Sequence, residues 1–241
     1  RSKTEFIRNI EHDIRTPFSG LLGMSDILFE QEKDVQKKDL LGIVRQSAKD
    51  LLCYMDDILD YSRTELGMIP IQLKKIDLKQ LLERMVAIEK PAALQKGLIL
   101  EAAYDEGLPA ILLGDQYRLE RILINVISNA IKFTEQGCVS INVKLLKEIK
   151  HRQLLVRFII KDTGIGIPQN KISYIYEKFT RLTPSNQGLY KGAGLGLRVV
   201  KQFVNDLEGE LEVDSVEGKG TTFYCTLMMK APLTDDLIDR E

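Results

Sequence analysis

A histidine lies beside an acidic residue near the N-terminus, in the segment His12-Asp13-Ile14-Arg15-Thr16-Pro17. A neutral imidazole is a competent nucleophile, and an unperturbed histidine pKa of about 6.5 leaves most of the rings neutral at about pH 7. Asp13 can orient the ring and accept the proton that leaves as the ring nitrogen forms a new bond. Thr16 lies one helical turn further along the same face. These neighbours favour a reactive histidine over the simpler interpretation of a surface side chain.

A second group of polar residues lies in the segment Asn125-Val126-Ile127-Ser128-Asn129-Ala130-Ile131-Lys132-Phe133. Asn125, Asn129 and Lys132 follow one another at i, i+4 and i+7, which places them on one face of an otherwise apolar helix. Carboxamide oxygens are suitable ligands for Mg²⁺, and a neighbouring lysine offsets the charge of a phosphate. The pattern favours a metal–phosphate site, whereas a single asparagine would be explained equally well as a helix cap.

Two glycine-rich segments could line a ligand. Asp162-Thr163-Gly164-Ile165-Gly166-Ile167-Pro168 follows a predicted strand, so that its carboxylate can accept a hydrogen bond from an exocyclic amine such as that of adenine. Gly192-Ala193-Gly194-Leu195-Gly196-Leu197 opens an amphipathic helix, whose free N–H groups favour phosphate. Either segment alone is compatible with an ordinary turn.

A Walker-type phosphate loop is excluded by the sequence. Gly218-Lys219-Gly220-Thr221 lacks both the leading glycine of that motif and the hydroxyl directly after its lysine. The segment Tyr176-Glu177-Lys178-Phe179-Thr180-Arg181 is followed by a polar stretch that ends near Lys191. Such a stretch can serve as a mobile lid over a ligand, although an ordinary loop has the same composition.

The reactive histidine requires a helix to position it. From Phe6 to Glu30 apolar residues recur at heptad spacing, and a second run extends from Leu41 to Ser62. We expect an antiparallel helical hairpin with a loop between Gln31 and Lys38, paired with a second copy in a four-helix bundle. In this register His12 takes the most solvent-facing position, and Pro17 is expected to kink the helix. The first seam comprises Ile7, Ile10, Ile14, Leu21, Met24 and Leu28. A helical linker or a monomeric coiled coil is the alternative.

Beyond Gly67 and Pro70 the pattern changes to mixed strands and helices. This mixture predicts an α+β fold, in which the helical hairpin is followed by an α/β sandwich. We expect domains at 1–66 and 67–230, with a tail or linker at 231–241. Strands are expected at 71–74, 98–103, 110–113, 139–146, 154–161, 210–214 and 221–228, and helices at 77–95, 115–133 and 194–207.

Composition excludes several classes of protein. The net charge of -1 over 241 residues gives no electrostatic basis for binding nucleic acid or a membrane surface. Cys53, Cys138 and Cys225 are too far apart for a paired zinc motif or a disulfide framework. No apolar run approaches the roughly 18 residues of a membrane span, and no signal peptide opens the chain. We expect a cytoplasmic piece of a longer protein, whose anchoring in the inner membrane would require segments absent from this chain.

Together these motifs resemble those of bacterial-type sensor histidine kinases. The first segment is similar to their phosphoacceptor helix, and the four later segments resemble the N, G1, F and G2 boxes of the GHKL superfamily of ATP-binding domains. The resemblance implies a homodimer that uses Mg²⁺ and ATP to phosphorylate His12. It also implies that Asp13 is the base, that Thr16 positions water for dephosphorylating the partner, and that the partner is the receiver domain of a response regulator.

The resemblance also implies a set of nucleotide-binding residues. Asn129 would be the principal Mg²⁺ ligand with Asn125 beside it, and Lys132 would contact phosphate. Asp162 would bind the adenine amine, and Phe133 and Thr222 would lie near the base. The pocket would be shaped by Gly164, Gly166, Gly192, Gly194, Gly196 and Leu197. The departures from the common pattern are Asp13 for Glu, Arg121 for Gln, Tyr176 for Phe and Lys191 for Gly, and none removes a proposed ligand.

Two other functions are compatible with these motifs. One is a GHKL ATPase or ATP-driven switch that never phosphorylates histidine, although such relatives lack the helix that carries His12. The other is a degenerate kinase that serves as a dimeric scaffold or chiefly as a phosphatase. The intact Asn129, Asp162 and glycine segments favour active nucleotide chemistry over that second alternative.

Overall fold

The computed structural model describes residues 2–65, 67, 69–177 and 194–233. The chain divides into two units, one containing the N-terminal residues as far as Ile69 together with described residues 194–196, and the other containing described residues 70–177 and 197–233. Each unit is described by itself. The predicted domain limits, 1–66, 67–230 and 231–241, stay predictions.

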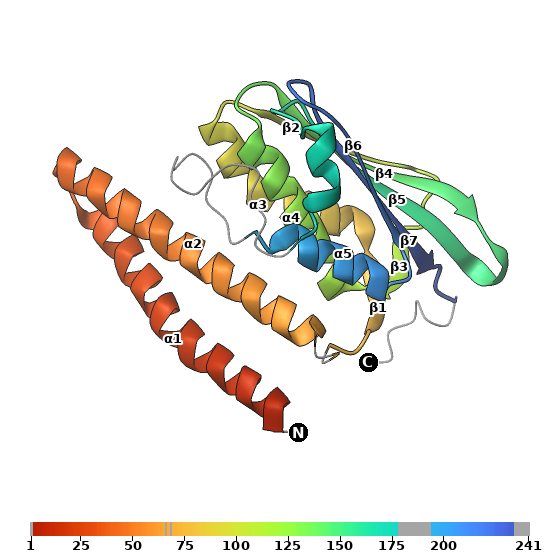
Figure 1. Cartoon of the computed structure of the whole chain (residues 1–241), viewed down its shortest axis with the longest axis horizontal. Helices are drawn as coiled ribbons and strands as arrows, with labels where there is room; N and C mark the ends of the chain where they lie inside the picture. The colour runs from red at the N-terminus through yellow and green to blue at the C-terminus, as the bar shows by residue number, and fades with distance from the viewer. Residues whose placement is uncertain (1, 66, 68, 178–193, 234–241) are drawn as a thin grey trace. The chain divides into compact units, whose positions relative to one another are not determined.

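The N-terminal unit is a hairpin of two long helices (Figure 1). Helix α1 spans Ser2–Gln31 and helix α2 spans Val35–Glu65, so only three residues join them. The loop is short because Asp34 caps α2, accepting a hydrogen bond from the Lys37 backbone N–H at 3.0 Å. The predicted helical hairpin is therefore confirmed, and its helices extend further into the loop than expected.

Within the hairpin, the two helices bury only part of the two predicted heptad runs. The Phe29 ring lies against Gly42 and under the Arg45 guanidinium, 4.0 Å from the ring centroid, and Ala48, Met55 and Leu59 of α2 are buried. Most large apolar residues of the two predicted runs stay exposed in the single chain, namely Ile14, Leu21, Met24, Leu28, Val44, Leu51 and Ile58. One stripe thus forms the hairpin, and a neighbouring apolar stripe remains uncovered.

The second unit contains one mixed sheet with helices on one face (Figure 1). Its described residues form seven strands in the order β1-β3-β7-β5-β4-β2, with β6 paired to β7. The β2–β4 pair is parallel, and every other pair is antiparallel. The strands are β1 (Leu73–Asp77), β2 (Ile99–Tyr104), β3 (Ile111–Asp115), β4 (Cys138–Glu148), β5 (Gln153–Asp162), β6 (Glu210–Val216) and β7 (Gly220–Lys230).

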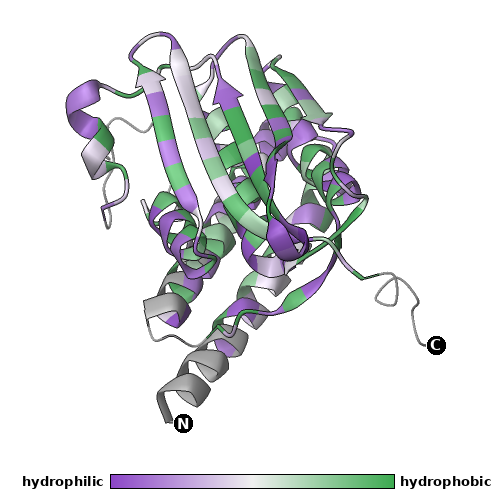
Figure 2. Cartoon of the chain, turned by 90° about the vertical axis from the view of Figure 1, so that its right-hand side faces the viewer, coloured by the Kyte–Doolittle hydropathy of each residue, from purple (hydrophilic) through white to green (hydrophobic). Residues whose placement is uncertain are grey.

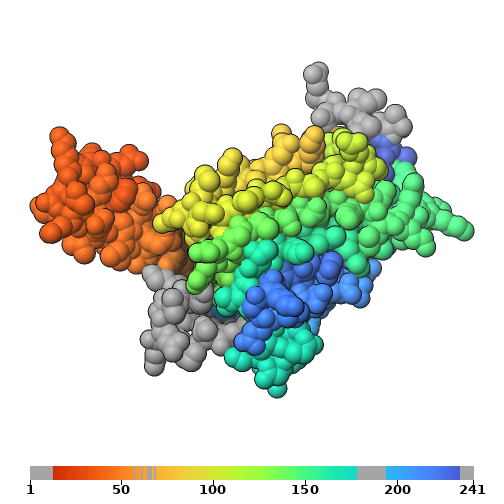
Figure 3. All heavy atoms as spheres, turned by 90° about the horizontal axis from the view of Figure 1, so that it is seen from above, coloured from red at the N-terminus to blue at the C-terminus, as the bar shows by residue number. Residues whose placement is uncertain are grey.

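The covering helices are α3 (Leu78–Gln95), α4 (Gln116–Phe133) and α5 (Gly196–Asp206). Helices α3 and α4 lie side by side, as the yellow and green residues of Figure 3 show. Alternate residues of the central strands are buried against these helices, and the same alternation of hydropathy is visible along the strands in Figure 2. The core of this unit therefore lies between the sheet and the helical layer, which confirms the predicted α/β sandwich.

Most predicted elements are present, with ends that differ by a few residues. The two long strands β4 and β5 extend into the segment between the predicted strands 139–146 and 154–161. A single 3₁₀ turn, η1 (Lys150–Arg152), lies between them. His151 and Arg152 adopt positive φ angles of 62° and 65° in that turn. A second 3₁₀ segment, η2 (Gln169–Tyr174), was not predicted because its short polar sequence has no helical period.

Candidate nucleotide-binding and phosphoacceptor sites

Helix α4 presents the predicted amides and lysine at the edge of its buried face. Asp115 begins the helix, its side chain accepting a hydrogen bond from the Arg118 backbone N–H at 3.0 Å. Asn125, Asn129 and Lys132 are half-buried, while the apolar stripe beside them is fully buried (Leu119, Ile122, Leu123, Val126 and Ile127). The buried apolar stripe fixes the rotation of the helix about its axis. The three polar side chains therefore lie together along one edge of that stripe.

The amides of α4 are suitable ligands for Mg²⁺. The Asn125 side-chain nitrogen donates to the carbonyl of Arg121 at 2.9 Å, so its amide oxygen is directed away from its own helix. Within the described residues, the Asn129 amide makes no hydrogen bond. Mg²⁺ commonly uses one or two protein oxygens together with water and substrate phosphates. Two neighbouring amides therefore fit an ion bound together with a phosphate ligand.

Asp162 lies at the end of β5 with one carboxylate oxygen occupied. Its Oδ1 accepts hydrogen bonds from the backbone N–H groups of Gly164, at 2.8 Å, and Thr221, at 3.1 Å. No described residue donates to Oδ2, which can therefore receive an exocyclic amine. Burial raises the pKa of this carboxyl above its usual range, and the two backbone hydrogen bonds oppose that shift.

The turn after Asp162 is held between two other parts of the unit. Ile165 donates its backbone N–H to the Phe133 carbonyl at 3.1 Å, and a Cβ at Gly164 would overlap that same carbonyl. Gly166 has a φ of +67°, and a Cβ there would overlap the Val216 carbonyl. The structure therefore brings the C-terminal end of α4 and the predicted Asp-Gly-Gly turn together, and glycine is the residue that permits this close approach.

Sequence reasoning missed a hydroxyl pair beside this turn. Ser215 Oγ accepts the Ile167 backbone N–H at 2.8 Å and lies 2.9 Å from Thr221 Oγ1. Both residues are buried. Thr222 pairs with Lys161 and Asp214, and strand alternation directs it to the opposite face from Thr221. The role of Thr222 near adenine stays a prediction, and Thr221 is the threonine in contact with Asp162. The alternation of side chains along β7 is the sequence signal that could have distinguished Thr221 from Thr222.

The other predicted pocket residues are only partly described. Gly194 has a φ of +71°, Leu195 is buried, and α5 begins at Gly196 with Leu197 half-buried behind it. Gly192 and Lys191 lie outside the described residues, as does the F-box segment after Glu177.

Tyr176, which replaces the Phe of the common family pattern, lies within the described residues. The Lys201 ammonium lies 4.7 Å from the centroid of its ring. Its buried hydroxyl has no hydrogen-bond partner among the described residues. Burial raises the pKa of this hydroxyl to about 12.

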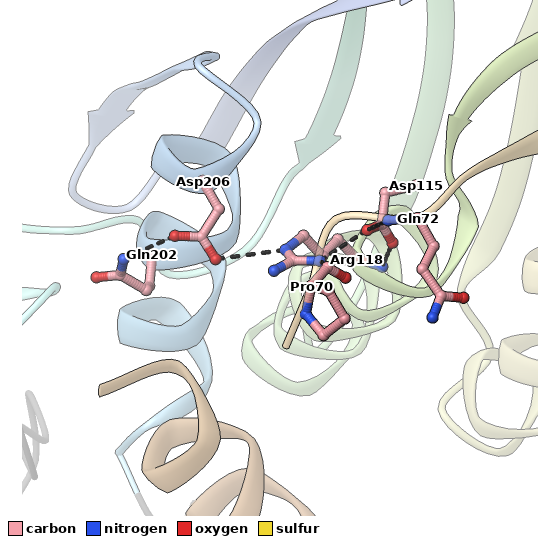
Figure 4. A network of polar contacts seen from close by, with 6 residues as sticks. All are labelled: Pro70, Gln72, Asp115, Arg118, Gln202 and Asp206. Atoms are coloured by element: carbon pink, nitrogen blue, oxygen red, sulfur yellow. Dashed lines mark hydrogen bonds and ion pairs between the residues drawn. The ribbon is translucent and has the colours of Figure 1, made fainter. Parts of the chain in front are cut away.

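A buried ion network joins the N-terminal end of α4 to the C-terminal end of α5 (Figure 4). Arg118 Nη1 bonds Asp115 Oδ2 at 2.7 Å, and its Nε bonds Asp206 Oδ2 at 3.3 Å. The same guanidinium donates to the Pro70 carbonyl at 3.4 Å, while Asp115 accepts the Gln72 backbone N–H at 3.0 Å. Sequence reasoning missed this network because its bonded partners are up to 88 residues apart in the chain.

The phosphoacceptor motif lies within α1, which continues as a helix through Pro17. Asp13 and Thr16 are exposed in the single chain, whereas the side chain of His12 lies outside the described part. The solvent-facing position predicted for His12 therefore stays a prediction. Arg15, the fourth residue of the motif, forms an ion pair with Asp56 of α2 at 2.6 Å. This contact, which the motif alone did not reveal, fixes the motif helix against its neighbour.

Comparison with known families identifies the chain. One family model, the His Kinase A (phospho-acceptor) domain, matches residues 2–67. A second, the histidine kinase-, DNA gyrase B-, and HSP90-like ATPase, matches residues 114–231. The chain belongs to the histidine kinase family. The matched ranges contain the histidine motif of α1 and the α4, Asp162 and α5 segments of this histidine kinase chain.

Curated relatives of this histidine kinase chain come from bacteria and from a slime mould. The sensor histidine kinase GacS of Pseudomonas protegens is 36% identical over 236 residues, which cover 98% of this chain and 25% of GacS. The hybrid signal transduction protein dokA of Dictyostelium discoideum is 36% identical, over 93% of this chain and 14% of dokA. The autoinducer 2 sensor kinase/phosphatase LuxQ of Vibrio parahaemolyticus is 34% identical, over 95% of this chain and 27% of LuxQ. The chain thus spans about a quarter or less of these relatives.

Solved structures share the fold of this chain. Full-length ShkA in complex with AMPPNP superimposes with a TM-score of 0.73 and 30% identity, over 95% of this chain and 47% of ShkA. The Acinetobacter baumannii histidine kinase AdeS, at 20% identity and a TM-score of 0.61, shares the fold over 91% of this chain and 98% of its own. Within the described residues, no helix combines the length and apolar character that a bilayer crossing requires.

Proposed function

We propose that this chain is the catalytic core of a protein-histidine kinase that transfers the γ-phosphoryl group of ATP to His12. The observation that carries the proposal is the juxtaposition of the α4 amide–lysine face with the Asp162 turn through the Phe133 carbonyl. The same chain carries a His-Asp-x-Arg-Thr-Pro helix, which supplies an acceptor for the phosphoryl group.

The nucleotide is held by residues of the second unit. Asp162 Oδ2 accepts the adenine amine, and Phe133 lies near the base. Lys132 contacts phosphate, while Asn129, with Asn125 beside it, ligates Mg²⁺. The ion, when bound, offsets the charge of the phosphates, and phosphoryl transfer depends mainly on such positioning and charge neutralisation.

The His12 ring carries out the transfer step. A ring nitrogen forms a bond to the γ-phosphorus as the bond to the ADP oxygen breaks, and ADP leaves with the bridging oxygen. The proton on the other ring nitrogen is stabilised or accepted by Asp13. Asp13, the proposed base, is exposed on the surface of α1.

We further propose that phospho-His12 passes its phosphoryl group to an aspartate of a response-regulator receiver domain. Thr16, exposed one turn beyond His12, would orient water for hydrolysis of the phosphorylated partner, and its exposure supports this role. LuxQ, one of the relatives, is named as a sensor kinase/phosphatase. The uncovered apolar stripe of α1 and α2 supports a homodimer formed through the helical hairpin.

The test is incubation of the chain with γ-labelled ATP and Mg²⁺, with wild type compared with His12→Ala. We expect a label that is stable in alkali and labile in acid, and that is absent from the variant. Asn129→Asp, which changes a proposed Mg²⁺ ligand while leaving the helix intact, should reduce the rate of labelling. Hydrolysis of ATP without labelling of the protein would instead indicate a GHKL ATPase and contradict the kinase proposal.

A further inference from the structure

Lys96 lies where α3 ends, and its side chain reaches the C-terminal end of α4. It is the C-cap residue of α3, with its backbone N–H bonded to Ala93 and Leu94 carbonyls. Its ammonium donates to the carbonyl oxygens of Ile131 at 2.8 Å, Lys132 at 2.7 Å and Thr134 at 3.1 Å. An ammonium has three N–H donors, and here all three are directed at backbone carbonyls.

These contacts complete the C-terminal end of α4. The last turn of a helix leaves carbonyl groups without donors from the helix itself. In α4 the Ala130 carbonyl accepts from Thr134 Oγ1 at 2.7 Å, and the Phe133 carbonyl accepts from the Ile165 backbone N–H. Lys96 satisfies the neighbouring carbonyls and places a positive charge at the negative end of the helix dipole.

The turn that Lys96 holds also carries the proposed phosphate contact. Lys132 contributes one of the three carbonyls, and its own ammonium lies 5.0 Å from the centroid of the Phe133 ring. Asn129 lies one turn earlier on the same helix. A change in the backbone of this turn would therefore move Lys132 directly. It would reach Asp162 only through the Ile165–Phe133 hydrogen bond, because the hydrogen bonds of Asp162 itself are to Gly164 and Thr221.

Lys96 is an exposed residue whose ammonium is partly covered by the end of α4. Burial lowers the pKa of the Lys96 ammonium from its ordinary value, and the Glu135 carboxylate opposes that shift.

We propose that Lys96 is a positioning residue that fixes the last turn of α4 and so sets Lys132 for binding the phosphates of ATP. The proposal rests on the proposed nucleotide site of this kinase core. It assigns to Lys96 no contact with the nucleotide and no part in the chemical step.

The test compares the affinities of Lys96→Met for two probes, AMPPNP with Mg²⁺ and adenosine, by titration calorimetry or competition. We expect the AMPPNP dissociation constant to rise about tenfold, as when the supporting contacts of a metal site are lost, and that of adenosine to change much less. The matched control is Lys90→Met, an exposed lysine of the same helix, which should bind as wild type does. Lys96→Arg keeps the charge and several donors and should recover most of the affinity.

A double-variant cycle with Lys132→Ala separates positioning from a general structural role. Because Lys96 acts through Lys132, adding Lys96→Met to Lys132→Ala should cause little further loss. Equal losses for AMPPNP and adenosine, or a lower melting temperature with unchanged AMPPNP affinity, would overturn the proposal. If Lys96→Met does not fold, Lys96→Gln, which retains two donors, is measured under the same criteria.

Failure of the Lys96 proposal can be distinguished from failure of the proposed kinase function. Wild-type protein that binds no nucleotide would refute the nucleotide site and the role of Lys96 together. Wild-type protein that binds AMPPNP but never labels His12 would refute only the kinase activity, and the Lys96 comparison would still decide the positioning role.

Discussion

Asp162 combines burial with a charge that is only partly compensated. The residue has 6% of its surface exposed, and two backbone N–H groups contact the same carboxylate oxygen. Burial disfavours the ionised form, which raises the pKa of the carboxyl. Perturbed carboxylates of this kind occur preferentially at functional sites. The partly compensated charge is explained if the second carboxylate oxygen accepts a hydrogen bond from an incoming amine.

Asp162→Asn should separate ligand binding from folding. The amide oxygen of Asn can accept both backbone hydrogen bonds, so the turn is retained. Its amide nitrogen would then face the adenine amine, and two donors cannot pair, so nucleotide affinity should fall about a hundredfold. Calorimetric titration with AMPPNP measures the loss. Unchanged affinity would contradict the assignment of Asp162 to adenine.

The same variant has a defined dependence on pH. Because the folded-state pKa of Asp162 is raised, the folded protein binds more protons than the unfolded chain between the ordinary and the raised value. The stability of wild type relative to Asp162→Asn should therefore be highest below the ordinary carboxyl pKa and decrease as pH rises through the raised one. Denaturant titrations from about pH 3 to about pH 7 test this sign. A relative stability that increases with pH over that range would contradict it.

At the scale of elements, the Arg118 network joins α4, α5 and the segment that precedes β1. Arg118 and Asp115 side chains are 3% and 2% exposed, so removal of one partner leaves a buried charge without its counterion. The Phe203 ring of α5 also lies beneath the guanidinium, 5.5 Å from its centroid. The network thus fixes the ends of the two helices that carry the proposed N and G2 segments.

Arg118→Met should reduce the free energy of unfolding by about 3–5 kcal/mol, the range for breaking a buried ion pair. The matched control is Arg84→Met, which removes a more exposed pair with Glu120 and should cost at most about 1 kcal/mol. Urea denaturation followed by circular dichroism compares the two variants. Similar costs for both would show that burial of the Arg118 pair is unimportant for stability.

The elements were largely readable from the sequence because local signals set them. Asp77 and Asp115 mark helix starts in both the sequence and the structure, each accepting a backbone N–H three residues ahead. The contacts of Lys96 were not readable, since its acceptors are backbone carbonyls 35 to 38 residues away and carry no side-chain signature. Thr221, rather than Thr222, contacts Asp162. This depends on the register of β7, because a shift of one residue exchanges the two faces of the strand.

The packing of the hairpin was also only partly predictable. Heptad spacing correctly indicated two apolar helices, but it did not distinguish the stripe that joins α1 to α2 from the stripe that stays exposed. Phe29 and Met55 belong to the internal contact, whereas Leu21 and Leu51 do not. Both stripes have helical spacing, and only the three-dimensional crossing of the helices assigns them.

At the scale of the whole molecule, the exposed stripe predicts self-association. Leu51→Glu places a charge at the centre of the uncovered surface of α2, where Leu51 is 43% exposed, and should convert a dimer into a monomer without unfolding the hairpin. Lys49→Glu, on an exposed position of the same helix, is the matched control and should remain dimeric. Light scattering after size exclusion measures the mass. A monomeric wild type, or a dimeric Leu51→Glu, would contradict the proposed interface.

The separation of the two stripes on the hairpin has a consequence for cells that contain many related kinases. Residues such as Leu21 and Leu51 are exposed, whereas Ala48 and Met55 are buried on a neighbouring stripe, so the exposed set can change with little effect on the buried one. With the proposed dimer, gene duplicates can therefore diverge in their choice of mate while each hairpin continues to fold. Insulation between parallel signalling pathways can then evolve by substitutions on one surface, with no loss of the scaffold that carries the reactive histidine.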